Sequence, residues 1–401
     1  MLSYDDALAR ILTAVSEPLE AESVGLEQAR GRTLAQDFLA PSDLPPFDNS
    51  MVDGYAVRAA SVGAASPTVP LCLPVGMEIA AGLWPTRALR AGEAARIFTG
   101  APLPDGCDAL VMVEDTDEED GWVTLRDPGS GRYIRRRGSD LAQGALALPA
   151  QTVLTAGTVG VLAALNQATT LCHRRPRVGI LSTGDELIPV GTQPLAPGQI
   201  RDSNGPALTA AVEEAGGVVT LRLHAHDTIA SVTEAFAALA HCDLVLSSGG
   251  VSVGDHDHVK EVLEAQGTLD FWRIAIKPGK PLAFGRLGDA LFFGLPGNPV
   301  SSLVTFELFV RPVLKKLAGH TQLLRPQLQA TLTTALPHAP GRREFVRVGL
   351  EWQDGVCLAT PTGAQGSHRT VSMSGADALL VAHEDHGDYP AGETLPALLL
   401  T

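Results

Sequence analysis

Glycine, serine and acidic residues gather between a hydrophobic run and an amphipathic run in the segment "LSSGGVSVGDHDHVKEVLEAQG". Ser247, Gly249, Gly250 and Ser252 offer hydroxyl groups and bare backbone N–H groups, which suit a phosphate or another oxyanion at the start of a helix. Asp257 follows, and a carboxylate next to a phosphate suits Mg²⁺. The glycine spacing matches neither G-x-G-x-x-G nor a P-loop, so a loose strand-to-helix turn is the alternative interpretation.

Carboxylates also follow two other predicted strands. Glu186 comes after the buried run "RVGILST", and Asp227 comes after the run "VVTLRLH". In an open α/β sheet the ligand lies at the carboxyl ends of the strands, so these loops and the glycine–serine loop are expected to share one edge. Glu186, Asp227 and Asp257 suit Mg²⁺ that bridges a phosphate, and helix capping is the alternative role of each carboxylate.

Four histidines flank the same loops and raise the alternative of a zinc site: His224, His226, His256 and His258. A structural zinc site more usually has Cys ligands or tightly spaced His ligands within one element. The two rings of an H-x-H pair at a strand end are expected to point to opposite sides. We therefore favour magnesium over zinc.

Two further segments suit an anion. In "IKPGKPLAFG", Lys277 and Lys280 flank a Pro-Gly turn that would hold two ammonium groups close together, and a solvated hairpin is the alternative. In "GLPGNPVSS", Gly297 and Asn298 precede Pro299 at the first turn of an apolar helix. Their free amides would face the same pocket, and simple capping is the alternative.

Composition limits the partners of the protein. The chain of 401 residues has 30 Lys and Arg against 45 Asp and Glu, a formal net charge of −15. Such a surface repels nucleic acid and anionic membranes, so an anionic substrate needs a local basic pocket. The five cysteines never form a C-x-x-C pair, and the N-terminus lacks the pattern of a signal peptide. We expect a cytoplasmic protein that binds neither nucleic acid nor membrane.

The hydrophobic patterns predict a multidomain α/β protein. From residue 177 onward, apolar runs alternate with amphipathic helical patterns, which indicates a doubly wound, mostly parallel core domain. Short apolar runs between Gly and Pro turns predict a β-rich N-terminal module and a small C-terminal β-barrel. An uncharged stretch predicts a buried helix near 153–165, too short in its apolar part to cross a bilayer. Ser3 and Ser203 are the expected caps of two helices.

Seven segments occur in an order that resembles the molybdopterin molybdenumtransferases, namely the MoeA-type enzymes and the E domain of gephyrin. They are "LPPFDNSMVDGYAVR", "RIFTGAPLPDGCDALVMVED", "IRRRGSD", "STGDEL", "SGGVSVGDHD", "KPGKP" and "LPGNPVSS", with a weaker tail match at "GSHRTVSMSGADALLV". The resemblance implies an enzyme that inserts molybdate, its substrate, into the dithiolene of adenylylated molybdopterin. It also implies release of AMP, with Mg²⁺ as the cofactor.

Matched residue by residue, the resemblance implies functional roles at further positions. The implied catalytic residues are Asp53, Thr99, Arg135, Asp140, Glu186, Asp227 and Asp257. The implied substrate contacts are Lys277, Lys280, Pro296, Pro299, Arg347 and Ser367. In the tail, Asp377 stands where the family usually has Asn.

We expect four domains. A discontinuous helical linking domain is predicted at residues 1–46 and 139–172, and a β-rich domain at 47–138. The α/β molybdopterin-binding domain is expected at 173–321, and a C-terminal β domain at 322–401.

Asp53, Thr99 and Asp140 belong to the N-terminal half, whereas Glu186, Asp257 and Lys280 belong to the sheet edge of the α/β domain. The N-terminal half must therefore approach that edge by folding back or from a second chain. The resemblance implies the second route, an elongated homodimer whose two clefts are each built from both chains. It also suggests a molybdopterin adenylyltransferase and molybdoenzyme acceptors as protein partners.

Two other functions remain as alternatives. A molybdopterin adenylyltransferase shares the "STGDEL" and "SGGVS" loops by resemblance, but the extra modules at 1–172 and 322–401 argue against it. A non-enzymatic scaffold is the other, because gephyrin also clusters receptors. Nothing in the sequence resembles the linker or partner domain of gephyrin.

Overall fold

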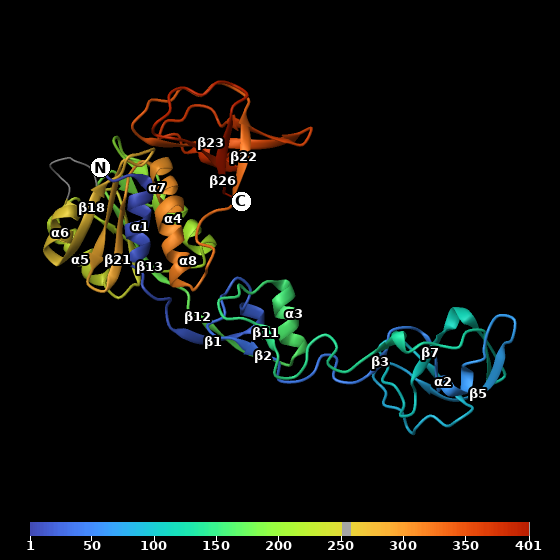
Figure 1. Cartoon of the computed structure of the whole chain (residues 1–401). Coiled ribbons are helices and arrows are strands. Elements are labelled where there is room, and N and C mark those ends of the chain that lie inside the picture. The colour runs from blue at the N-terminus through green and yellow to red at the C-terminus, as the bar shows by residue number, and fades with distance from the viewer. Residues whose placement is uncertain (251–257, 401) are drawn as a thin grey trace.

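A six-stranded sheet at one end of the molecule positions most of the predicted site (Figure 1). The computed structural model describes residues 1–250 and 258–400. The sheet has the order β16 (Val218–Ala225), β13 (Arg177–Thr183), β17 (Leu244–Ser248), β21 (Ala290–Leu295), β20 (Pro281–Leu287) and β18 (Gly267–Arg273). The first four strands run parallel, and β20 is antiparallel to both of its neighbours. The predicted mostly parallel core is confirmed.

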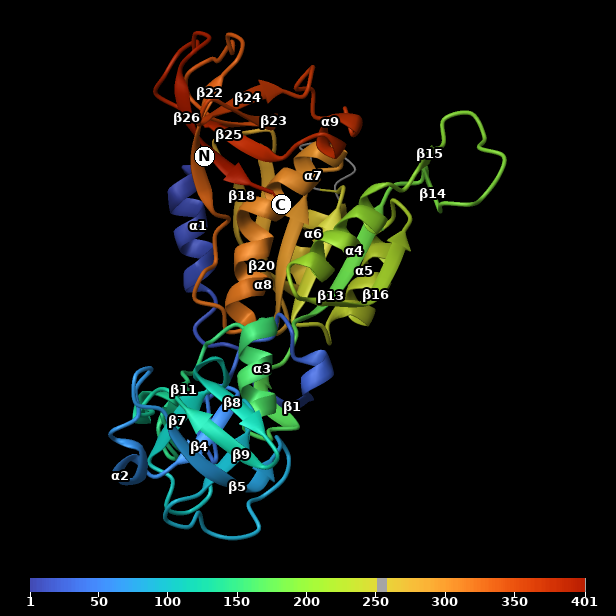
Figure 2. The same cartoon turned by 90° about the vertical axis from the view of Figure 1, so that its right-hand side faces the viewer.

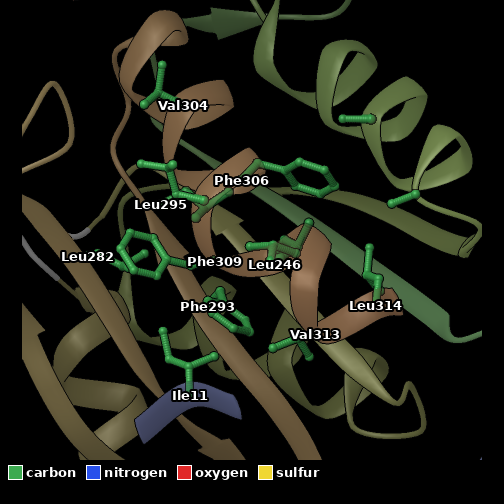
Figure 3. Close-up of a cluster of buried hydrophobic side chains, with 14 of the residues drawn as sticks. Ile11, Leu246, Leu282, Phe293, Leu295, Val304, Phe306, Phe309, Val313 and Leu314 are labelled. Atoms are coloured by element: carbon green, nitrogen blue, oxygen red, sulfur yellow. The ribbon is translucent and has the colours of Figure 1, made fainter. Parts of the chain in front are cut away.

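Alternate side chains of these strands pack on opposite faces of the sheet, as the pleat requires. Val178, Ile180 and Phe293 face one hydrophobic cluster, part of which Figure 3 shows around Phe293. Leu181 and Phe292 face the other cluster. The first cluster is completed by α1 (Tyr4–Thr13), α4 (Asn204–Glu214), α7 (Pro299–Thr305) and α8 (Arg311–Leu317), and the second by α5 (Ile229–Leu239) and α6 (His258–Gln266). Helices therefore cover both faces, and the core is doubly wound.

The two expected helix caps differ in outcome. Ser3 is confirmed, because its hydroxyl oxygen accepts the N–H of Asp6 at 3.1 Å. The expected cap at Ser203 is wrong, since its side chain makes no capping hydrogen bond. Oδ1 of Asp202 instead accepts the N–H of Gly205 at 2.8 Å, because a carboxylate one position earlier reaches the same free amide.

The C-terminal part is a closed β-barrel. Its strands are β23 (Arg343–Gln353), β24 (Val356–Pro361), β22 (Gln327–Leu332), β26 (Thr394–Leu399) and β25 (Ala378–Ala382), and β25 pairs back with β23. The short strand β19 (Ile276–Lys277) of the core runs parallel to β23 and joins the barrel to the core. A short helix, α9 (Val371–Ser374), lies between β24 and β25.

The N-terminal half extends away from the core and ends in a second sheet (Figures 1 and 2). That sheet has the order β7 (Ala109–Met112), β4 (Gly54–Val57), β6 (Ala94–Ile97), β5 (Leu71–Ile79), β9 (Trp122–Leu125) and β8 (Thr116–Glu119), with α2 (Ala59–Val62) beside it. Two-stranded pairs connect this module to the core. They are β1 (Ala21–Gly25) with β12 (Thr169–His173), β2 (Phe38–Leu39) with β11 (Leu146–Leu148), and β3 (Asn49–Ser50) with β10 (Ile134–Arg135).

Two helices lie differently from the sequence-based expectation. Helix α1 packs against the core sheet through Ala7, Leu8 and Ile11 rather than against the linking segments. The expected buried helix is α3 (Ala156–Ala164), but only Leu162 in it is buried, because its small residues face solvent. Within residues 1–250 and 258–400, no helix is long and apolar enough to cross a membrane.

His320, just after α8, gives the core a predictable sensitivity to acid. Burial, together with the charges of Lys315 and Arg311, lowers the pKa of His320 from 6.5 to about 4. The unfolded chain therefore takes up this proton first, and the stability present above pH 6.5 is lost as the pH falls towards 4. We expect His320→Gln to reduce the fall in Tm between pH 7.5 and 5, measured by calorimetry. His241→Gln, at an exposed turn, is the control, and an equal fall in both variants would contradict the assignment.

Candidate active site at the edge of the parallel sheet

A pocket of about 740 Å³ opens where the parallel strands of the core end. Its wall combines the loops after β13, β16 and β17 with the start of α7 and one residue of the barrel. The expectation that these loops share an edge therefore agrees with the structure. The predicted residues that line the pocket are Glu186, Asp227, Gly249, Gly250, Pro296, Gly297, Asn298 and Pro299.

The glycines after β17 are required by close packing. Gly249 and Gly250 have φ angles of 92° and 66°, which side-chain-bearing residues rarely adopt. A Cβ on Gly249 would lie 2.9 Å from Oγ1 of Thr183. The N–H of Gly249 donates to the carbonyl of Leu295 at 3.2 Å, so it is not free for a ligand.

The two serines at the end of β17 differ in their hydrogen bonds. Ser247 is fully buried in β17, and its hydroxyl has no hydrogen-bond partner among the described residues. Oγ of Ser248 accepts from Nδ2 of Asn204 at 2.8 Å, and the same amide donates to the carbonyl of Gly297 at 2.7 Å. Asn204 thus ties the two glycine-containing loops together. Ser252, His256 and Asp257 lie outside the described residues.

Two carboxylates face the pocket from neighbouring strand ends. Glu186 folds back beside Gly184, where an added Cβ would lie 2.5 Å from its carboxylate oxygen. Asp227 accepts the N–H of Asp185 through Oδ2 at 3.4 Å. In the described part of the chain, no group of three or more His, Cys, Asp or Glu residues is placed to hold a metal ion. A metal ion at this pocket would therefore need further ligands besides the His, Cys, Asp and Glu side chains of the described residues.

The histidines do not point as expected. The rings of His224 and His226 lie on the same side, with centroids 5.5 Å apart. The expectation of opposite sides is wrong, because residues two apart share one face of a strand. Nε2 of His224 contacts the carbonyl of Gly184 at 2.8 Å, and Nδ1 of His226 contacts Oδ1 of Asp185 at 2.8 Å.

The two predicted lysines differ in their surroundings. Nζ of Lys277 lies 3.0 Å from Oε2 of Glu344 in the barrel. Lys280 is exposed, makes no ion pair within the described ranges, and precedes Pro281, which lines the pocket. Lys280 therefore has the more available positive charge.

Arg347 is fully buried in β23 of the barrel, and it does not line the pocket. Its Nε donates to Oγ of Ser372 at 2.9 Å, while its Nη1 has no partner among the described residues. Burial lowers the pKa of this guanidinium. A buried cation without a carboxylate partner is costly, which makes Arg347 suited to an anionic ligand.

Residues 365–368 connect Arg347 to the pocket. Oε1 of Gln365 accepts the N–H of Arg347 at 2.9 Å, and the carbonyl of Ser367 accepts the N–H of Val300 at 3.2 Å at the start of α7. The next residue, His368, lines the pocket. Our sequence analysis missed His368 and Asn204, although His368 follows Ser367 in the quoted tail segment and Asn204 follows a predicted cap.

The N-terminal half carries a second group of predicted residues. Oδ1 of Asp53 accepts the backbone N–H of Thr99 at 2.7 Å and its hydroxyl at 2.8 Å. These two hydrogen bonds lower the pKa of the Asp53 carboxyl. Arg135 and Asp140 line a separate hollow of about 650 Å³. Figure 1 places β3 and β7 of this module far from α6 and α7, so one chain does not bring the two groups together.

Three family descriptions match successive parts of the chain. Residues 2–166 match the MoeA N-terminal region (domains I and II), and residues 329–400 match the MoeA C-terminal region (domain IV). Residues 179–316, which contain the sheet-edge pocket, match the probable molybdopterin binding domain. Together they define a multidomain enzyme of molybdenum cofactor biosynthesis.

Relatives and solved structures agree over the full length. A protein of Haemophilus influenzae named molybdopterin molybdenumtransferase is 40% identical, and the match covers 98% of each chain. A protein of the same name from Bacillus subtilis is 35% identical, covering 100% of this chain and 94% of its own. The crystal structure of the molybdopterin biosynthesis MoeA protein from Pyrococcus horikoshii has a TM-score of 0.85 at 30% identity and 100% coverage of both chains. The chain belongs to the family of molybdopterin molybdenumtransferases, which are transferase enzymes.

The packing of Gly250 leads to a prediction with a matched control. A Cβ at Gly250 would meet Cγ2 of Val259, whereas at Gly288, with a φ of 60°, it would meet nothing within 4 Å. Gly288→Ala should cost about 1–2 kcal/mol from backbone strain alone. Gly250→Ala should cost about 1–3 kcal/mol more because of overpacking. Denaturant unfolding monitored on the core measures both, and equal losses would show that the contact with Val259 does not matter.

Proposed function

We propose that this protein inserts molybdate into the dithiolene of adenylylated molybdopterin, forms the molybdenum cofactor and releases AMP in a magnesium-dependent reaction. The observation that carries the proposal is the sheet-edge pocket, in which two carboxylates and two glycine-containing loops face one space. Its volume of about 740 Å³ lies in the range of small-molecule sites. Full-length similarity to named molybdopterin molybdenumtransferases supports the same reaction.

The loops of the pocket are assigned to the phosphates of the adenylylated pterin. Gly250 adopts a left-handed conformation at the pocket wall, and Gly297 and Asn298, which precede α7, line the pocket next to this loop. Backbone amides at such positions suit phosphate oxygens. His368 adds a ring from the barrel side, where it can contact a flat base or pterin.

Molybdate is assigned to the cations near the barrel. Arg347 is buried, its Nη1 has no partner among the described residues, and a dianion would supply one. Lys280 adds an exposed ammonium at the turn that leads into the pocket. Ser367 lies on the segment that joins Arg347 to α7. These residues give an acidic chain the local positive charge that an anionic substrate needs.

Magnesium fits the carboxylates in one particular way. Glu186 and Asp227 both line the pocket, but they do not form a complete ligand set within the described residues. Mg²⁺ commonly binds through one or two carboxylates together with substrate phosphates and water, which agrees with this arrangement. When bound, it would neutralise charge on the phosphate that leaves as AMP. Asp257 is assigned as a third ligand from its position in the sequence.

The cleft is proposed to be shared between two chains. Asp53, Thr99, Arg135 and Asp140 belong to the extended N-terminal module, which lies far from the pocket of its own chain (Figure 1). The hydrogen bonds from Thr99 lower the pKa of the Asp53 carboxyl and so favour its ionised form. Both bonds go to Oδ1, so Thr99 does not contact Oδ2. A homodimer with two-fold symmetry would bring each N-terminal module to the pocket of the other chain. Closing the cleft in this way would exclude water from the reacting adenylate.

We retain two further proposals. The four-domain division is kept as a proposal, except that α1 is assigned to the α/β domain because it packs there. A molybdopterin adenylyltransferase that supplies the adenylylated substrate, and molybdoenzymes that accept the cofactor, are the proposed protein partners.

Release of AMP from adenylylated molybdopterin, measured with and without molybdate, tests the proposed reaction. Lys280→Gln should weaken molybdate binding about tenfold or more, because a hydrogen bond to a charged group contributes about 1.5–3 kcal/mol. Lys277→Gln should have a smaller effect, since Glu344 already balances that charge. Formation of the adenylate from molybdopterin and ATP would favour the adenylyltransferase alternative. Equal molybdate affinity in wild type and Lys280→Gln would contradict the assigned role.

A further inference from the structure

The two histidines at the end of β16 contact the loop that carries Glu186. In the sheet register, His224 lies beside Ser182 and Ala225 beside Thr183, so the chain leaves β16 and β13 at the same level. Nε2 of His224 meets the carbonyl of Gly184 at 2.8 Å. A carbonyl oxygen only accepts, so this nitrogen donates. The contact holds the loop at its first residue.

The second contact lies one residue further along the loop after β13 and two residues further along the chain from His224. Nδ1 of His226 meets Oδ1 of Asp185 at 2.8 Å. The two loop backbones are also joined reciprocally, because Asp227 N–H donates to Oδ1 of Asp185 and Asp185 N–H donates to Oδ2 of Asp227, each at 3.4 Å. His226 and Asp185 immediately precede Asp227 and Glu186, the two carboxylates of the pocket.

Stability does not explain these contacts. The side chains of His226 and Asp185 are 71% and 65% exposed. Exposed ion pairs contribute little to folding, typically about 0–1 kcal/mol. His224 and His226 are both exposed, and the centroids of their rings lie 5.5 Å apart. What the contacts do determine is the distance between two loops, each of which carries one carboxylate into the pocket.

We propose that His224, His226 and Asp185 form a positioning clamp that sets the separation of Glu186 and Asp227 and thereby the affinity of the pocket for a divalent cation. The inference rests on the proposed magnesium site. Carboxylates that repel each other must be held in place before the cation arrives, and hydrogen-bonded partners of ligand residues commonly supply this restraint. The clamp also gives the H-x-H pair a role that does not involve binding zinc.

The test uses the full-length protein and two readouts. Hydrogen–deuterium exchange of metal-free protein reports whether the backbone of residues 183–188 is restrained. Titration with Mn²⁺ in the presence of AMP, which supplies the phosphate, followed by the electron paramagnetic resonance signal of the free ion, reports cation affinity without any reaction. His226→Ala and Asp185→Ala should both speed exchange in this segment and weaken Mn²⁺ binding about tenfold or more, the effect typical of residues that orient metal ligands.

Conservative variants separate positioning from a general loss of structure. Nδ2 of Asn can replace the Nδ1 donor of His, so His226→Asn should stay close to wild type, and Asp185→Asn should keep an acceptor. His241→Ala changes an exposed histidine near the opposite edge of the sheet and should have no effect. AMP release by His226→Ala should need about tenfold more Mg²⁺ but reach a similar maximal rate.

The outcomes distinguish the clamp from the proposed reaction. If His226→Ala matches His241→Ala in both exchange and Mn²⁺ affinity, the clamp is wrong. If wild type binds no Mn²⁺, the cation site and the clamp fall together. If Mn²⁺ affinity follows the clamp variants but no AMP is released, the clamp stands and the proposed reaction is wrong.

Discussion

The parallel direction of four neighbouring strands is the constraint on which the site depends. Because β16, β13, β17 and β21 run the same way, the loops that follow them must begin at one edge of the sheet. Glu186, Asp227, Gly250 and Asn298 therefore line one pocket although they are widely separated in the sequence. The hydrophobic clusters on both faces fix the strands, and through them the loops.

Charge is the second constraint. A chain with a net charge of −15 cannot attract a polyanion over its whole surface, so local features must do so. The barrel carries one proposed feature of this kind, the buried Arg347, which makes no ion pair with a carboxylate among the described residues. The pairing of β19 with β23 holds the barrel against the core. The hydrogen bond between Ser367 and the start of α7 connects the barrel to the pocket. The small barrel thus contributes to the site as well as to the architecture.

Sequence patterns were sufficient for much of this arrangement. Continuous apolar runs separated by amphipathic helices predicted the core, and the rule for parallel sheets predicted that Glu186 and Asp227 would meet. Other features depend on contacts between distant segments, which periodicity does not encode. Examples are the packing of α1 on the core, the approach of His368 from the barrel and the bridge made by Asn204. The direction of the two histidine rings was predictable from the strand period, and our expectation misapplied it.

The central claim is that each active cleft is completed by a second chain. Co-expression of Asp53→Ala chains with Asp227→Ala chains tests it most directly, because each variant alone is expected to be inactive. In a shared arrangement, one cleft of every mixed dimer combines an intact N-terminal module with an intact pocket. With random pairing about half of the dimers are mixed, so AMP release should recover to about a quarter of the wild-type rate. No recovery in a preparation shown to contain mixed dimers would mean that each chain completes its own site.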